Sequence, residues 1–152
     1  GFEHVNPEGA LHYLHYHRAV KTEYELACMR KANQIALAAH ASAERAFRAG
    51  ASEFDINLAY LKTARQGDNQ VPYSNIVALN ENSAILHYTV LETQSPDESR
   101  SFLIDAGASF HGYAADITRT YATAENDFAN MIKAVDALTL RLADTLKPGL
   151  SY

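Results

Sequence analysis

The stretch Phe102-Leu103-Ile104-Asp105-Ala106-Gly107-Ala108-Ser109-Phe110-His111-Gly112-Tyr113-Ala114-Ala115-Asp116 decides the fold, because it joins two β-strand patterns and gives each a carboxylate. An apolar run leads into Asp105, and a second extended pattern, from about residue 112 to 121, contains Asp116. The turn near His111 predicts a strand reversal between them. If the reversal is symmetric, the two aspartates lie opposite one another on antiparallel strands, where like charges destabilise a sheet unless something neutralises them.

Three arrangements would neutralise this carboxylate pair. The two groups could share one proton, as acid–base dyads do, or they could ligate a pair of divalent metal ions. Alternatively, one aspartate caps the turn and the other forms a salt bridge with Arg119 or Arg100. The apolar neighbours of Asp105 and Asp116 predict partly buried carboxylates, and such groups are costly without partners.

The flanking sequence predicts helices on both sides of a central β section, which is an α+β fold. Residues 22–48 have apolar side chains at three- and four-residue steps, with Thr22 and Glu25 as a capping box. A second helix is predicted over residues 52–65 and a last one over 126–145, the latter with a stripe of Phe128, Met131, Ile132, Val135, Leu138 and Leu142. Residues 75–79 and 84–90 predict a β-hairpin, and a further strand ends at Asp105.

Composition excludes several classes of protein. The 152 residues are 47% hydrophobic and 20% charged, and no apolar run approaches the roughly 18 residues that a membrane span needs. The net charge of −5, without a long basic run, argues against nucleic acid as a partner. The single cysteine, Cys28, cannot form an internal disulfide and fits a small buried side chain in a cytoplasmic protein. Both ends of the chain suggest that it was cut from something longer.

The two segments Phe102-Leu103-Ile104-Asp105-Ala106-Gly107 and Gly112-Tyr113-Ala114-Ala115-Asp116-Ile117-Thr118-Arg119-Thr120 resemble the metal-binding hairpin of the prolidase and aminopeptidase P group. These enzymes are "pita-bread" metallopeptidases. The resemblance extends to residues 18–32, which are similar to the opening of that catalytic domain, and to residues 75–82 and 86–89. The bacterial prolidase branch, which includes organophosphorus acid anhydrolases, is especially similar.

The resemblance implies roles for five residues. Asp105 and Asp116 would be metal ligands, with Asp116 bridging two divalent ions, most plausibly Mn²⁺. His87 would be a catalytic histidine that faces the substrate, and Tyr73 and Leu86 would line the substrate pocket with it. For His87 alone the ordinary interpretation is a satisfied strand histidine, and Tyr73 could equally fill a gap in the core.

By the same resemblance, residues 1–152 are the N-terminal half of a catalytic domain, without the preceding domain and without the later histidine and two glutamates of a complete site. The parent would hydrolyse dipeptides with C-terminal proline and form a homodimer, with organophosphate triesters as a side activity. The isolated chain would bind metal weakly and be inactive. The alternatives are an aminopeptidase P, a creatinase-like enzyme, or a metal-free peptide-binding relative.

Other polar residues have simpler interpretations. His12, His15 and His17 lack acidic or cysteine partners and belong to an aromatic-rich entry segment rather than to a metal site. His111, at the expected turn, is predicted to be exposed. Arg119 is expected to pair structurally with a carboxylate.

Overall fold

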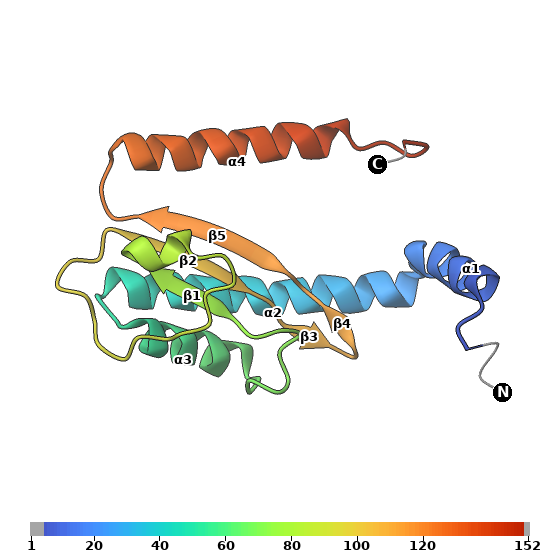
Figure 1. Ribbon diagram of the computed structural model, residues 1–152, viewed down its shortest axis with the longest axis horizontal. Coiled ribbons are helices and arrows are strands. Elements are labelled where there is room, and N and C mark those ends of the chain that lie inside the picture. The colour runs from blue at the N-terminus through green and yellow to red at the C-terminus, as the bar shows by residue number, and fades with distance from the viewer. Residues whose placement is uncertain (1–4, 151–152) are drawn as a thin grey trace.

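The computed structural model describes residues 5–150. Its elements are α1 (Glu8–Ala19), α2 (Glu23–Arg48), α3 (Glu53–Ala64), β1 (Ile76–Leu79), the 3-10 helix η1 (Asn80–Ala84), β2 (Ser101–Ala106), β3 (Ser109–Phe110), β4 (Tyr113–Ala114), β5 (Ile117–Ala122) and α4 (Asp127–Thr145) (Figure 1). The predicted α+β class is confirmed.

The long helix α2 begins and packs as its sequence predicts. The Thr22 hydroxyl accepts from the backbone N–H of Glu25, and the Glu25 carboxylate accepts in return from the Thr22 N–H at 2.6 Å, which completes the capping box. Its buried face consists mainly of alanines spaced three or four residues apart: Ala32, Ala36, Ala39 and Ala43. These small side chains let the helix backbone approach the sheet closely. Cys28 is buried on the same face, as predicted.

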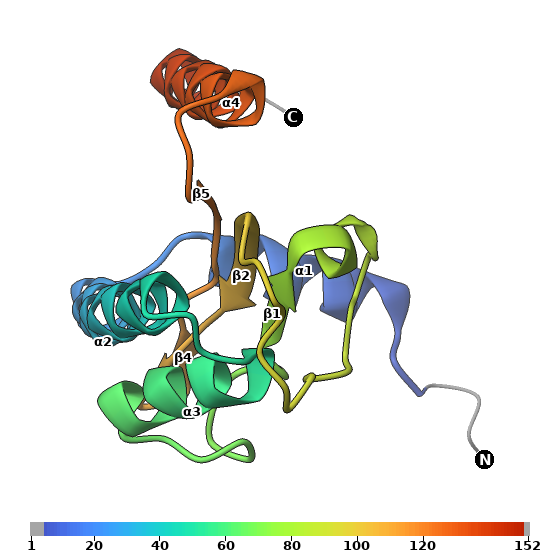
Figure 2. The same cartoon turned by 90° about the vertical axis from the view of Figure 1, so that its left-hand side faces the viewer.

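The sheet has the order β1-β2-β5, with both pairs antiparallel. Alternate side chains of β2 point to opposite faces. Phe102 and Ile104 are fully buried against α2 and α3, where they join Phe47, Ile56 and Tyr60 in the main core cluster. Figure 2 shows the sheet with α2 and α3 to one side. Asp105 alternates with these core residues and therefore belongs to the opposite face.

The predicted hairpin of residues 75–79 and 84–90 is wrong in its second strand. β1 forms, but the chain then enters η1, and residues 85–91 have no regular structure. The partner of β1 is β2 instead. The reversal begins at Asn80, whose φ of +51° lies in the left-handed region, and the apolar run at 84–90 imitates a strand without any neighbouring strand to pair with.

The two terminal helices contribute little to the core. α1, where only an aromatic-rich segment was expected, has no buried residue, and the predicted α4 buries only Ala129. Figures 1 and 2 show α4 standing away from the rest of the molecule. A space of about 1,010 Å³ separates its apolar face from the sheet, with Leu103 on one side and Phe128 and Val135 on the other.

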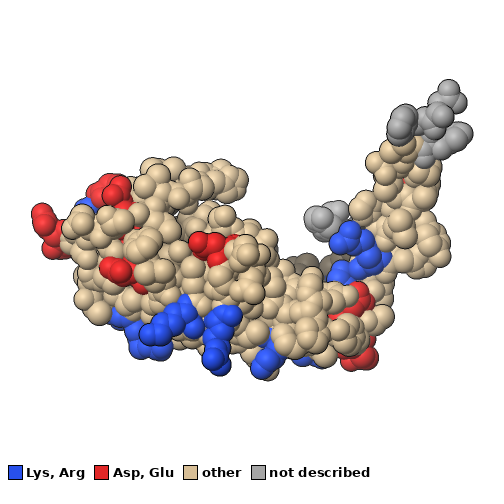
Figure 3. All heavy atoms as spheres, turned by 90° about the horizontal axis from the view of Figure 1, so that it is seen from below, with Lys and Arg blue, Asp and Glu red and all other residues tan. Residues whose placement is uncertain are grey.

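The surface carries charge of both signs. Figure 3 shows Lys and Arg side chains gathered along one edge of the body, and α2 has exposed Arg30, Lys31, Arg45 and Arg48. The same helix carries Glu23 and Glu44, and Arg48 forms an ion pair with Glu44 at 2.7 Å. This mixture is an ordinary solvated helix surface. Within residues 5–150, no helix is both long and apolar enough to cross a membrane.

Candidate metal centre

Asp105 and Asp116 lie on the same face of the sheet, but not directly opposite one another as the sequence analysis expected. Asp105 pairs with Thr118, and Asp116 comes two residues before Thr118, in the short gap between β4 and β5. Because side chains alternate along a strand, the two carboxylates are diagonal neighbours on the face opposite α2 and α3.

The hydroxyl of Tyr73 joins the two carboxylates. It lies 2.8 Å from Oδ1 of Asp105 and 2.8 Å from Oδ1 of Asp116. Two oxygens in contact with one hydroxyl must converge, so the carboxylates point toward a common place rather than apart. Burial, followed by its hydrogen bonds to Asp116 and Asp105, raises the pKa of Tyr73, and the hydroxyl therefore stays protonated as a donor.

This bridge leaves the carboxylate pair only partly satisfied. A phenol has one proton, so Tyr73 cannot donate fully to both acceptors, and the remaining oxygen lone pairs are free to ligate a cation. Asp105 is half-buried, whereas Asp116 is exposed, which corrects the expectation that both would be partly buried. A hard oxygen donor pair of this kind suits Mg²⁺, Ca²⁺ or Mn²⁺.

Arginine does not neutralise this pair. Arg100 forms its ion pair with Glu81, and the guanidinium of Arg119 donates to the backbone carbonyl of Thr118 at 2.7 Å. The expectation that Arg119 pairs with a carboxylate is therefore wrong: its side chain folds back onto the neighbouring backbone. The alternative that explained the aspartates by salt bridges with Arg119 or Arg100 fails with it.

Gly107 allows the two aspartate-bearing segments to approach each other. A Cβ at this position would lie 2.0 Å from the carbonyl oxygen of Ala115 and 2.8 Å from Cγ of Pro72. Only glycine fits such a distance. The same close approach places Pro72, and with it Tyr73, next to the aspartates, so the glycine of the Asp-x-Gly pattern shapes the site directly.

His87 and the aspartates line one depression of about 340 Å³. Its lining consists of Tyr73, Ser74, Ile76, His87, Thr89, Asp105 and Asp116. The predicted pocket residues Tyr73 and His87 are thus brought together with both predicted ligands. Leu86, by contrast, is 85% exposed and is not among the lining residues. His87 is a loop residue with a φ of +54°, which corrects its interpretation as a strand histidine.

The remaining histidines are not part of the depression. His111 is exposed at its turn, as predicted, and its Nδ1 lies 3.3 Å from the Tyr24 hydroxyl. His12, His15 and His17 are exposed on α1. Over the described part of the chain, no group of three or more His, Cys, Asp or Glu residues is arranged to hold a metal ion. Asp105 and Asp116 are therefore a pair of carboxylates without a third such residue beside them in the described part of the chain.

Sequence reasoning missed three lining residues, Ser74, Ile76 and Thr89, and the buried carboxylate of Glu53. Ile76 could have been found, because it pairs with Asp105 in the sheet and must share its face. Glu53 follows the N-cap Ser52 of α3 and looks like an ordinary acidic residue in a first helical turn. No local pattern distinguishes it from such a residue.

The α+β fold, with a convergent carboxylate pair on its open face, agrees with the match to a family model. The model of metallopeptidase family M24 matches residues 27–152. The chain belongs to this family.

Similar curated proteins carry the name Xaa-Pro dipeptidase. The chain is 64% identical over 156 residues to an Xaa-Pro dipeptidase of Pseudoalteromonas atlantica and 59% identical over 152 residues to one of Shewanella sediminis; each match covers 100% of this chain and 35% of the relative. The chain therefore spans about a third of the length of these relatives. Zn-substituted E. coli aminopeptidase P in complex with product matches 85% of this chain and 30% of its own, with 32% identity and a TM-score of 0.73. The predicted pita-bread fold is confirmed.

Proposed function

We propose that this chain is the first part of the catalytic domain of an Xaa-Pro dipeptidase, an enzyme that hydrolyses dipeptides with C-terminal proline. The observation that carries the proposal is the convergence of Asp105 and Asp116 on one hydroxyl, beside His87. Identities of 57–64% to Xaa-Pro dipeptidases support this substrate class over that of aminopeptidase P, at 32% identity. The proposal includes that residues 1–152 form the N-terminal half of this catalytic domain.

Asp105 and Asp116 would be metal ligands in this enzyme. Two solved variants of E. coli aminopeptidase P replace single aspartates that lie eleven positions apart, the separation of Asp105 and Asp116. Two divalent ions, which we take to be Mn²⁺ from the preference of carboxylate ligands, would polarise the scissile carbonyl and supply an activated water when bound. Tyr73 would keep the carboxylates oriented through its protonated hydroxyl.

His87 would contact the substrate. It lies at the depression that holds both aspartates, where an imidazole N–H can donate to the substrate carbonyl oxygen as negative charge develops on it. Ser74 and Thr89 add hydroxyl groups to the same lining. Leu86 remains a candidate pocket residue only if a segment outside residues 5–150 covers its exposed side chain. A cytoplasmic homodimer is the proposed setting of the intact enzyme.

The test is Asp116→Asn in the intact protein, with Asp68→Asn in an exposed turn as the matched control. We expect Asp116→Asn to lower kcat/KM for an Xaa-Pro dipeptide by about 100-fold or more, because one metal-binding oxygen becomes an amide. Bound metal, measured by elemental analysis, should fall in parallel. The control should keep both. Full activity and full metal content in Asp116→Asn would contradict the proposal, and preferential cleavage of longer Xaa-Pro peptides would favour aminopeptidase P.

A further inference from the structure

Glu53, the first residue of α3, has a carboxylate that is buried and saturated with hydrogen bonds; only 1% of the residue is exposed. Its Oε1 accepts from the backbone N–H of Leu79 at 2.8 Å and from Nδ2 of Asn82 at 2.9 Å. Its Oε2 accepts from the hydroxyl of Tyr88 at 2.7 Å and from the backbone N–H of Glu92 at 3.0 Å. One side chain thus holds the end of β1 and three later points of the segment that follows it: Asn82, Tyr88 and Glu92.

The donors around Glu53 require an ionised carboxylate. The Tyr88 hydroxyl accepts from Nδ2 of Asn82 at 3.0 Å, so its own proton goes to Glu53. If Glu53 were protonated, its O–H would face the groups that already donate to the carboxylate, and it would find no acceptor there. No Lys or Arg forms a salt bridge with it in residues 5–150. The positive N-terminal end of α3 and the hydrogen bonds stabilise the charge instead.

The segment that Glu53 holds carries His87. Residues 85–91 have no regular structure, and His87 has a left-handed backbone with φ +54°. For a residue other than glycine this conformation is strained and persists only where the surroundings fix it. Tyr88, the next residue, is 6% exposed and directed inward to Glu53, while His87 is exposed at the depression. The buried tyrosine therefore fixes the backbone from which the histidine projects.

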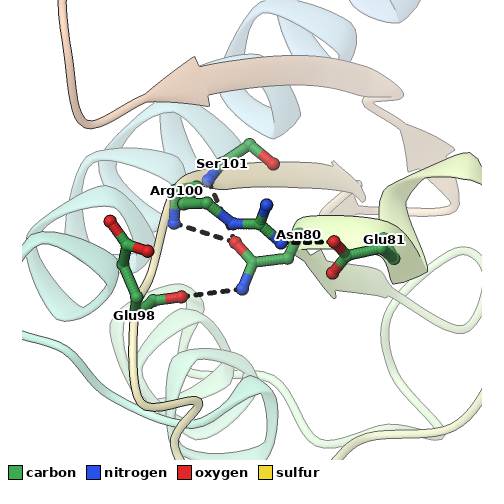
Figure 4. Close-up of polar contacts among 5 residues, drawn as sticks. All are labelled: Asn80, Glu81, Glu98, Arg100 and Ser101. Carbon is green, nitrogen blue, oxygen red and sulfur yellow. Dashed lines mark hydrogen bonds and ion pairs between the residues drawn. The ribbon is translucent and has the colours of Figure 1, made fainter.

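A second set of contacts holds only the base of this loop (Figure 4). Nδ2 of Asn80 donates to the carbonyl of Glu98 at 2.8 Å, and its Oδ1 accepts from the backbone N–H groups of Arg100 at 2.8 Å and Ser101 at 3.3 Å. Arg100 also pairs with Glu81. These contacts join η1 to the start of β2 and do not reach residues 85–91. Glu53 holds that segment from the inside through Tyr88, while its end is also held by the packing of Leu91 on the main core cluster and by the N–H of Phe54, which donates to the carbonyl of Glu92 at 3.1 Å.

We propose that Glu53 is a positioning residue for the metal centre: through Tyr88 it fixes the backbone of His87 and keeps the imidazole at the depression shared with Asp105 and Asp116. The proposal rests on the proposed function, because it gives a purpose to the placement of His87. Glu53 itself contacts neither the aspartates nor the lining of the depression.

The experiment is a mutant cycle in the intact, metal-loaded protein with an Xaa-Pro dipeptide as substrate. Glu53→Gln keeps the shape of the side chain but turns one acceptor into a donor that faces donors. We expect kcat to fall by about tenfold or more in the wild-type background. In the His87→Ala background the same change should lower kcat by no more than about twofold, because the loop no longer presents an imidazole.

Hydrogen exchange of the metal-free protein supplies a readout that is independent of activity. In Glu53→Gln, the amides of residues 80–92 should exchange faster while those of α2 keep their rates. Glu81→Gln makes the same chemical change in an exposed carboxylate at the base of the loop, and it should alter neither kcat nor exchange at residues 85–91.

Tyr88→Phe removes one donor and keeps the carboxylate. Tyr88→Phe should lower kcat less than Glu53→Gln does, and its effect should likewise shrink in the His87→Ala background. It replaces Glu53→Gln if that variant fails to fold.

An equal loss of kcat with and without His87, or unchanged exchange over residues 80–92, would overturn the proposal. Full activity of His87→Ala would also overturn it. If Asp116→Asn were inactive in the same assay, the proposed metallopeptidase function would still stand. If the intact protein has no dipeptidase activity, the proposed function fails and with it the catalytic purpose of Glu53. The exchange rates would then still decide whether Glu53 orders the loop.

Discussion

Gly107 lies in close contact with the segment that carries the second aspartate. Its missing side chain leaves room for the Ala115 carbonyl and for Pro72. Because Pro72 precedes Tyr73, the contact that Gly107 permits also sets where the Tyr73 hydroxyl meets Asp105. At this scale, packing and the geometry of the candidate metal centre depend on the same atoms.

Gly107→Ala should therefore damage both stability and the site. We expect the free energy of unfolding of the intact protein to fall by about 3 kcal/mol or more, since the backbone itself must move to admit the methyl group. Gly9→Ala is the matched control: nothing lies within 4 Å of its added Cβ, and alanine in a helix should be neutral or stabilising by up to about 1 kcal/mol. Thermal and denaturant unfolding would measure both, and equal stability of the two variants would contradict the model of a closed contact.

His40 connects α2 to β2 next to the metal centre. Its Nε2 lies 3.0 Å from the carbonyl of Ala106, which can only accept, so the ring donates from Nε2. Its Nδ1 is buried without a partner. This arrangement suits the neutral ring, and burial is the main cause that lowers the pKa of His40 below its usual value of 6.5.

The lowered pKa predicts a dependence of stability on pH. Below about pH 6.5 the unfolded chain takes up a proton that the folded chain resists, so the stabilisation is present above this pH and is lost as pH falls through the folded pKa. The contribution of one such group has a slope of at most about 1.4 kcal/mol per pH unit. His40→Gln, which keeps a donor for Ala106, should flatten the curve between about pH 6.5 and pH 5 in denaturant unfolding. Parallel curves for the two proteins would contradict this assignment.

At the scale of the elements, local signals predicted helices better than they predicted the loop. The capping box of Thr22 and the N-cap of Ser52 are interactions within a few residues, so sequence alone located the starts of α2 and α3. The path of residues 79–92 is held by Glu53, which lies in another element and accepts hydrogen bonds from four groups along it. An apolar run could therefore resemble a strand while a distant carboxylate holds it in a loop.

The candidate site was predictable in its chemistry and less so in its geometry. The strand pattern and turn indicated Asp105 and Asp116 as a carboxylate pair, and the resemblance added their metal role and placed Tyr73 and His87 with them. Their exact arrangement was not: symmetry of the reversal suggested opposed carboxylates, but the register pairs Asp105 with Thr118. The shared hydroxyl of Tyr73 is a contact across 32 residues for Asp105 and 43 for Asp116, which no local pattern encodes.

At the scale of the whole molecule, the stripe of α4 faces a space rather than a core. Met131 is 55% exposed, Val135 57% and Leu142 58%. Apolar surface of this kind on one helix promotes association when nothing covers it. The unpaired outer edges of β1 and β5 add backbone groups that are open to another strand.

The 152-residue chain by itself should accordingly self-associate at micromolar concentrations. Val135→Glu, on the stripe, should shift sedimentation velocity profiles toward the monomer, because a charge would have to be buried in the contact. Ala137→Glu, on an exposed position of the same helix outside the stripe, is the control and should leave association unchanged. A monomeric wild-type chain over this concentration range would show that the apolar face is tolerated in water.

The isolation of α4 also implies a hierarchy of local stability within the chain. A helix that buries one residue shares little of the free energy that holds α2, α3 and the sheet together. Its backbone can open without disturbing the cooperative unit around Phe102 and Tyr60. Asp105 lies on β2 and Asp116 directly before β5, and both strands belong to the sheet of that cooperative unit. Fraying of α4 would therefore leave the two carboxylates and their tyrosine in place.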